Sequence, residues 1–215
     1  MTFTDEIAAA FSPTNPLPPV LRQAMEFLES QGCVRHFTRT QQRYISLYPQ
    51  PEYASHITFQ VPDVSHTAIW TGSEDPAINQ RLSIFLRTGG DGSWAGLWLD
   101  DDNRQRIVHL GSGSGSTMLG ILVNDAEDLL RLLAIGYDEL CWPEQFSSTP
   151  EEVREQDSDG DTYLPPPMAL RNHVEHTLGP GIPQRAAEFI SSPESMDADE
   201  STDPFWNWLK QVRNE

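Results

Sequence analysis

The 215-residue chain lacks any run of about 18 consecutive apolar residues, the length that crosses a membrane as a helix, so we expect no membrane span. It contains only two cysteines, Cys33 and Cys141, which excludes the disulfide scaffold of a small secreted domain. Its first residues include Asp5 and Glu6, where a secretory signal peptide would carry Lys or Arg. These features predict a cytoplasmic protein.

Cationic side chains are also scarce. The chain has 14 Lys and Arg residues against 32 Asp and Glu residues, which gives a formal net charge of −18. A surface of this sign repels DNA, RNA and anionic lipid and attracts a basic partner, although the simpler interpretation is that it only keeps the protein soluble. The imbalance is greatest in residues 121–164, where twelve acidic residues face only Arg131 and Arg154. We therefore expect a basic protein partner, and neither a nucleic acid nor a membrane.

The middle of the chain has the pattern of an antiparallel sheet. The runs LSIFLRT, SWAGLWLD, RQRIVHL and TMLGILV follow one another at intervals of about a dozen residues, with turn-forming residues between them. Upstream, SHITFQV places Ile57, Phe59 and Val61 on one face of a further strand. An amphipathic helix should begin after the proline pair at residues 18–19, and Thr4 should cap a shorter helix that ends at Phe11.

Helical patterns dominate the rest of the chain. AEDLLRLLAIGYDEL follows the cap candidates Asn124 and Asp125, and its leucines predict a helix buried against the sheet. We expect one α+β domain over residues 1–180, with a central, largely antiparallel sheet packed by helices. An acidic linker should occupy residues 181–203, loose over 191–203, and a short helix over residues 204–215 should dock through Phe205, Trp206 and Leu209.

The glycine-serine stretch from Gly111 to Ser116 allows three interpretations, namely a phosphate-binding loop, a flexible linker or a turn. A dinucleotide-binding fingerprint fails because Ser116 occupies the place of its third glycine, and an ATP-type phosphate loop fails because Ile121 replaces the required lysine. A flexible linker would separate TMLGILV from the other strands. The stretch is therefore predicted to be a hairpin connection whose ends pair and whose middle stays mobile.

Other polar groups give no catalytic pattern. His173 and His176 are three residues apart on a predicted helix, but zinc hydrolases use a spacing of four and a third ligand. Residues 157–168 depart from a calcium loop in the positions of its glycine and its last ligand. The aspartates at 100–102 should form a hairpin turn, and both cysteines should be buried. We expect no enzymatic activity, no cofactor and no bound metal.

The segment RIVHLGSGSGSTMLGILVNDAEDLLRLLAIGYDEL, from Arg106 to Leu140, resembles the most characteristic half of the SUKH superfamily. DPFWNWL near the end of the chain resembles a terminal motif of its longer members, and LPPVLRQAMEFLESQG loosely resembles their first helix. The resemblance covers about half of the chain. It implies an α+β fold without enzymatic activity, and a bacterial immunity protein that binds and blocks a cognate toxin in the cytoplasm.

These observations lead to three hypotheses. The first is an immunity protein that neutralises a basic toxin by direct contact. The second is a regulatory or scaffold protein without a toxin partner, as in the yeast cell-wall-synthesis regulator of the same family. The third is a metal-dependent hydrolase that uses His173, His176 and an aspartate.

The immunity hypothesis predicts a contact surface that combines an acidic face with adjoining aromatic anchors, although Tyr137 and Trp142 could equally belong to the core. Its residues are Tyr137, Asp138, Glu139, Trp142, Glu144, Phe146, Glu151, Glu152, Glu155, Asp157, Asp159, Asp161 and Tyr163.

Overall fold

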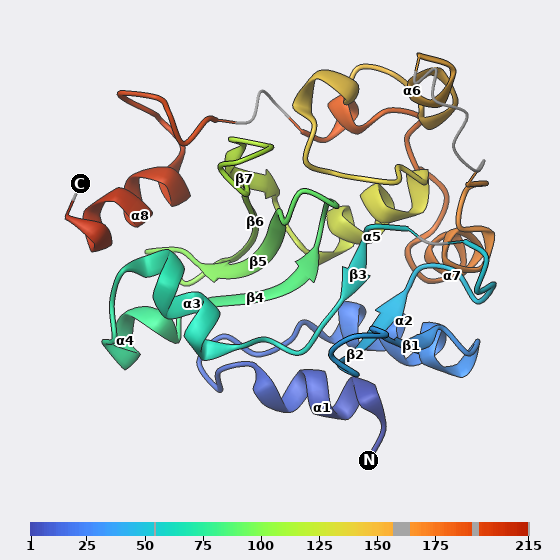
Figure 1. Cartoon of the computed structure of the whole chain (residues 1–215), viewed down its shortest axis with the longest axis horizontal. Coiled ribbons are helices and arrows are strands. Elements are labelled where there is room, and N and C mark those ends of the chain that lie inside the picture. The colour runs from blue at the N-terminus through green and yellow to red at the C-terminus, as the bar shows by residue number, and fades with distance from the viewer. Residues whose placement is uncertain (54, 157–163, 191–193, 215) are drawn as a thin grey trace.

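A computed structural model describes residues 1–53, 55–156, 164–190 and 194–214. In these residues, seven antiparallel strands form one sheet in which each strand neighbours the next along the chain (Figure 1). The strands are β1 (Val34–His36), β2 (Arg43–Ser46), β3 (Thr58–Phe59), β4 (Leu82–Arg87), β5 (Trp94–Leu99), β6 (Gln105–Leu110) and β7 (Leu119–Val123). The α+β fold with an antiparallel sheet is thus confirmed.

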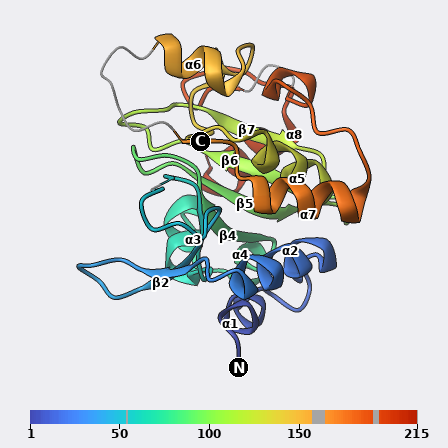
Figure 2. The same ribbon diagram turned by 90° about the vertical axis from the view of Figure 1, so that its right-hand side faces the viewer.

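Helices pack on both faces of this sheet (Figures 1 and 2). They are α1 (Phe3–Ala10), α2 (Pro19–Ser30), α3 (Val64–Thr71), α4 (Pro76–Asn79), α5 (Ala126–Ile135), α6 (Pro150–Gln156), α7 (Met168–Leu178) and α8 (Pro204–Arg213), with short 3₁₀ turns η1 (Pro143–Gln145) and η2 (Ala186–Glu188). None of the helices in the described ranges is both long and apolar enough to cross a membrane.

The larger core lies between one face of the sheet and the helices α2, α5 and α7, which contact one another (Figure 2). Helix α5 begins where the Asp125 side chain accepts hydrogen bonds from the backbone N–H groups of Glu127 and Asp128, at 2.9 and 3.0 Å. It ends at Gly136, whose φ of 102° suits glycine. The leucines between these caps are buried, so the prediction of a helix packed on the sheet is confirmed.

The second core joins helix α8 to the opposite face of β4–β7. The ring of Trp98 lies 5.4 Å from that of Phe205 and 5.6 Å from that of Trp208, measured between centroids. Asp203 both caps the helix, by accepting from the Trp206 N–H at 2.9 Å, and accepts from the Ile121 N–H of β7 at 2.8 Å. Phe205, Trp206 and Leu209 are buried, which confirms the predicted docking of the terminal helix.

The segment before α8 differs from the loose linker that its composition predicts. The backbone of residues 194–196 extends the sheet beyond β7: Leu119 donates to the Glu194 carbonyl and Met196 donates to the Thr117 carbonyl, both at 2.8 Å. The Trp206 indole also donates to the Ser195 carbonyl at 3.0 Å. The unpaired backbone of an edge strand recruits a polar chain as readily as an apolar one, so composition alone misleads here.

Two predictions near the start of the chain also need correction. The first helix is capped by Thr2, whose side chain accepts from the Asp5 N–H at 3.1 Å, while Thr4 is buried and its hydroxyl donates to Glu29 at 2.7 Å. Strand β3 has only two residues, fewer than the alternation around Phe59 predicts. The chain leaves the sheet after it because Asp63 caps helix α3.

Candidate functional site

One end of the sheet carries two turns that are joined by hydrogen bonds, and it is called here the acidic end. It consists of the β4–β5 turn (residues 88–93), the β6–β7 turn (111–118) and the two segments that flank them, residues 137–156 and 194–203. Both flanking segments lie at the upper end of the molecule in Figure 1. The end is assembled from four separate parts of the chain because a meander brings alternate turns to the same edge.

Asp91 holds the two turns together. One of its carboxylate oxygens accepts from the Ser93 hydroxyl at 2.7 Å, the Ser112 hydroxyl at 2.8 Å and the Ser116 N–H at 2.9 Å. The other oxygen accepts from the Ser93 N–H at 2.9 Å. Burial alone would raise the pKa of Asp91, but these hydrogen bonds to the charged form outweigh it and lower the pKa to about 2. The carboxylate therefore stays ionised and acts as a structural anion.

The glycine-serine stretch is the hairpin connection that its sequence predicts, but its middle is fastened. Gly113 donates to the Ser116 carbonyl at 3.0 Å, and Gly115 donates to the Ser112 hydroxyl at 2.9 Å. A Cβ atom at Gly111 would lie 2.5 Å from the Ser116 carbonyl oxygen. Glycine is needed there for close backbone approach, and the predicted mobile middle is replaced by a hydrogen-bonded turn.

His109 lies beneath the turns and was not identified by sequence reasoning. Its Nδ1 lies 3.0 Å from the Met118 carbonyl and its Nε2 lies 2.9 Å from the Thr88 hydroxyl. Complete burial lowers its pKa to about 4, against the smaller opposing effects of the Met118 carbonyl and Asp91. The ring is therefore neutral at pH 7, with the proton on Nδ1 because a carbonyl can only accept, and it links β4 to the β6–β7 turn.

The chain after α5 runs along the β4–β5 turn. Leu140 donates to the Thr88 carbonyl at 2.8 Å, and Gly90 donates to the Glu139 carboxylate at 2.6 Å. The Trp142 indole donates to the same carboxylate, and Nε2 of His56 lies 3.9 Å from it. Asp138, half-buried beside it, has a pKa raised mainly by burial, an effect that interactions with His56 partly oppose. Glu139 is thus held against the turn, and Asp138 beside it is half-buried.

Cys33 and Cys141 are both buried, as predicted. Burial raises the pKa of each thiol, and for Cys141 the neighbouring carboxylates of Glu139 and Asp91 raise it further. A thiol that resists ionisation is a poor nucleophile, so neither cysteine is suited to catalysis.

Two of the four predicted aromatic anchors belong to the core. Tyr137 and Phe146 are each 3% exposed, and their ring centroids are 6.4 Å apart. The Tyr137 hydroxyl donates to the Ser148 carbonyl at 2.5 Å and accepts from the Ala186 N–H at 3.0 Å. These contacts bind the segment after α5 to residues near η2, so these two rings cannot anchor a partner. An aromatic residue in an acidic stretch can point into the core or toward solvent, and the local sequence does not distinguish these two orientations.

The remaining predicted contact residues fall into three groups. Trp142, Asp138 and Glu139 are half-buried and are engaged within the molecule. The four other described glutamates are exposed and lie on η1 and α6, namely Glu144, Glu151, Glu152 and Glu155. Asp157, Asp159, Asp161 and Tyr163 lie outside the described residues.

The exposed glutamates are partly balanced by arginines. Glu151 lies 3.3 Å from the Arg154 guanidinium, and Glu152 lies 3.1 Å from that of Arg185. Exposed pairs of this kind contribute little to stability and leave the local field acidic, because Glu155 and its neighbours add further negative charge.

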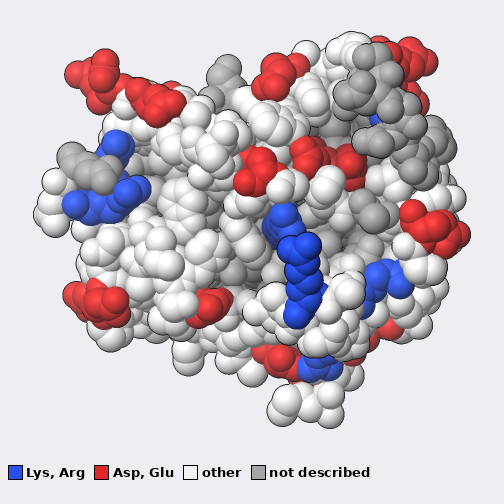
Figure 3. All heavy atoms as spheres, in the orientation of Figure 1, with Lys and Arg blue, Asp and Glu red and all other residues white. Residues whose placement is uncertain are grey.

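A second acidic group at the same end was missed by sequence reasoning. Asp197, Asp199 and Glu200 are exposed on the segment that extends β7 toward α8. Acidic side chains are visible along the upper part of the face drawn in Figure 3. The Asp-Pro pair at residues 203–204 marks the start of the helix that follows, but it gives no signal that the preceding residues lie against the sheet.

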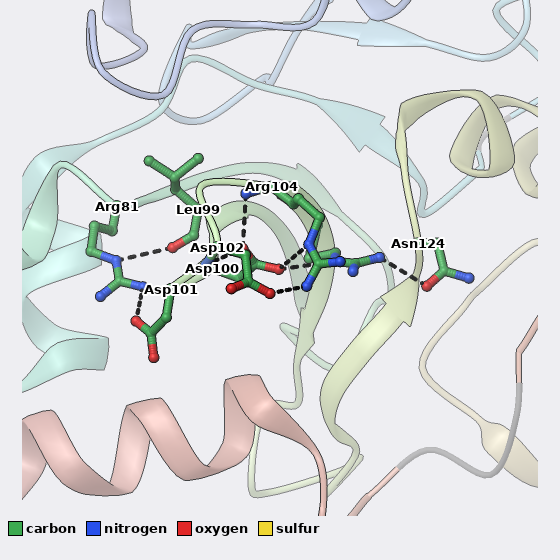
Figure 4. A network of polar contacts seen from close by, with 8 residues as sticks. Arg81, Leu99, Asp100, Asp101, Asp102, Arg104 and Asn124 are labelled. Atoms are coloured by element: carbon green, nitrogen blue, oxygen red, sulfur yellow. Dashed lines mark hydrogen bonds and ion pairs between the residues drawn. The ribbon is translucent and has the colours of Figure 1, made fainter.

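The opposite end of the sheet carries the β5–β6 turn, whose aspartates form the predicted hairpin (Figure 4). Asp100 accepts from the N–H groups of Asp102 and Arg104 at 2.9 and 2.8 Å, and from the guanidinium of Arg106 at 3.3 Å. Asp101 pairs with Arg81 at 2.7 Å. These carboxylates are occupied by the turn itself and by arginines.

The histidine pair does not form a site with other ligands. His173 stacks on Phe27 with ring centroids 4.3 Å apart, and burial together with the charge of His176 lowers its pKa. Across the described ranges, no group of three or more His, Cys, Asp or Glu side chains is arranged to hold a metal ion.

No protein-family model matches the chain, and no curated protein or solved structure matches it significantly. The fold and the candidate site define an α+β protein with a hydrogen-bonded sheet end that displays carboxylates from two separate segments.

Proposed function

We propose that this protein is an immunity protein that binds a basic protein toxin through the acidic end of its sheet and thereby neutralises it. The observation that carries the proposal is that two acidic segments, residues 144–155 and 197–200, both lie at the upper end of the molecule in Figure 1, on either side of the hydrogen-bonded turns of the sheet. The resemblance of Arg106–Leu140 to the SUKH superfamily points to the same function.

The physical case rests on rigidity and charge together. Asp91 and Glu139 fasten the turns from inside, so the surface above them is organised before a partner arrives. Exposed carboxylates on both sides of such a surface attract a basic protein over about 8–10 Å at physiological salt and orient it during encounter. Because the buried rings cannot serve as anchors, the contact should be mainly polar.

The test is neutralisation of the product of the gene next to the one that encodes this chain. Co-expression should relieve the growth arrest that this product causes, and the two purified proteins should form a stable complex. A neighbouring product that is not toxic, or a toxin that neither binds nor is relieved, would contradict the proposal. It would favour a regulatory or scaffold role without a toxin.

A further inference from the structure

A hollow of about 400 Å³ lies beside the β4–β5 turn, next to the acidic end. Its walls are mostly apolar, and its floor and sides come from the β1–β2 turn and from the neighbouring ends of β3, β4 and β5. The lining residues are Phe37, Thr38, Arg39, Thr40, Gln42, Gln60, Arg87 and Trp94. Basic side chains also stand out in the middle of the face drawn in Figure 3.

The two arginines of this hollow differ from most arginines of this acidic chain. Within the described ranges, nine other arginines lie within ion-pair distance of a carboxylate. Among the described residues, neither Arg39 nor Arg87 has a carboxylate within that distance. With acidic residues in more than twofold excess, two arginines without acidic partners in one hollow indicate a place for an anionic group from outside.

The geometry prepares these side chains for such a group. Arg87 donates to the carbonyls of Gly89 and Gly90, at 3.0 and 3.2 Å, which fixes the guanidinium without neutralising its charge. Trp94 lies directly opposite Arg87 in the β4–β5 register, so the two side chains stand on the same face of the sheet. Phe37, whose ring is tilted against that of Tyr44 with centroids 4.4 Å apart, adds an apolar wall.

We propose that this hollow, bounded by Phe37, Arg39, Arg87 and Trp94, binds an acidic peptide segment of a partner protein. Carboxylates of the segment pair with the two arginines, and an adjacent apolar side chain packs on the two rings. The hollow is an open surface feature between a turn and a sheet face, which suits a segment of chain better than a ligand that must be largely enclosed. This site adjoins the acidic end through the β4–β5 turn, but it carries the opposite charge.

The net charge of the chain does not prevent this binding. Charges are screened beyond about 8 Å at physiological salt, so the two arginines control the field within the hollow. Bidentate pairing of a guanidinium with a carboxylate then supplies both affinity and orientation. The global negative charge should slow the encounter with an acidic peptide, and moderate salt should raise the association rate by screening this repulsion.

The experiment uses fluorescein-labelled hexapeptides, capped at both ends, and the full-length chain in a fluorescence-anisotropy titration. The probes are Asp-Glu-Leu-Phe-Glu-Asp, its amide counterpart Asn-Gln-Leu-Phe-Gln-Asn, and Asp-Glu-Gly-Gly-Glu-Asp, with adenosine monophosphate as a competitor. The acidic peptide with the apolar pair should bind. Each of the other two peptides should bind at least about tenfold more weakly, because one lacks the carboxylates and the other lacks the apolar side chains.

Arg39→Gln is the decisive variant because this exposed side chain has no contact on which folding depends. It should weaken the binding of the acidic peptide with the apolar pair by about tenfold or more. Arg104→Gln, which makes the same charge change in the β5–β6 turn, should leave this binding unchanged. Equal binding of all three peptides, or unchanged binding to Arg39→Gln, overturns the proposal. So does displacement by adenosine monophosphate at equal concentration, which would assign the hollow to a nucleotide. None of these readouts involves a toxin, so a failure here is distinct from a failure of the immunity function.

Discussion

Replacing Asp91 by Asn should destabilise the acidic end. The carboxylate accepts four hydrogen bonds, three of them on one oxygen, and an asparagine amide would turn a donor toward at least one of these donors. The fold should survive, because the second core and the helices on the opposite face do not depend on this residue.

The magnitude follows from the lowered pKa. A shift from 3.8 to about 2, at ~1.36 kcal/mol per pKa unit, sets an upper bound of about 2.4 kcal/mol on the stabilisation. Asp91 is half-exposed, so solvent screening reduces the expected loss in the free energy of unfolding to ~1–2 kcal/mol at pH 7.

The stabilisation by Asp91 should decrease as the pH falls. The pKa of Asp91 is lower in the folded than in the unfolded chain, so its stabilisation is complete well above pH 3.8 and is lost as the pH falls through about 2. The difference between the wild-type protein and Asp91→Asn should therefore be about half as large at pH 3 as at pH 7.

Urea unfolding followed by tryptophan fluorescence at both pH values measures this difference. Asp197→Asn is the matched control, since it removes one exposed carboxylate at the same end of the sheet. If Asp91→Asn unfolds like that control, or if its deficit does not change between pH 7 and pH 3, the structural role assigned to Asp91 is wrong.

Three further changes test other parts of the structure by the same unfolding assay. Phe205→Ala should lower the free energy of unfolding by about 3–5 kcal/mol because the ring is fully buried, whereas Gln211→Ala on the exposed side of the same helix should have little effect. Gly111→Ala should cost about 1–3 kcal/mol, since its Cβ would meet backbone oxygen at 2.5 Å, and exposed Ser114→Ala should be neutral. Tyr137→Phe should cost about 1 kcal/mol through its lost hydrogen bonds and leave partner binding unchanged; weakened binding at equal stability would return this ring to the interface.

The sheet and the terminal helix were predictable because their signals are local. Turn residues separate β4 to β7 at regular intervals, and Asp203 followed by Pro204 announces a helix with an aromatic face. The pairing of residues 194–196 with β7 was not predictable in the same way. It depends on an edge that only the folded sheet provides, and the acidic composition of the segment argued against order.

The sequence predicted the charge of the candidate site, but it did not predict which side chains are exposed there. The acidic excess pointed to the region that includes α6, yet burial decides whether an aromatic ring in that region is an anchor or part of the core, and Tyr137 and Phe146 proved to be core. Asp91 and His109 were missed because their partners are far away in sequence. A single aspartate after a pair of glycines looks like any other turn residue.

The most direct test of the account is the salt dependence of association with the proposed basic toxin. Four exposed carboxylates of the acidic end would be replaced together by amides, with four exposed carboxylates elsewhere as a matched control. The test set is Glu144, Glu155, Asp199 and Glu200, and the control set is Glu26, Glu74, Glu127 and Glu175.

Association rates would be measured by surface plasmon resonance at about 50 and 300 mM salt, where screening differs by more than twofold in length. The account predicts that the rate for the wild-type protein and for the control variant falls steeply with salt. The test variant should already associate slowly at low salt, with little change in its dissociation rate. An association rate that does not respond to salt, or a test variant that binds like the control, would contradict the assignment of the acidic end as the contact surface.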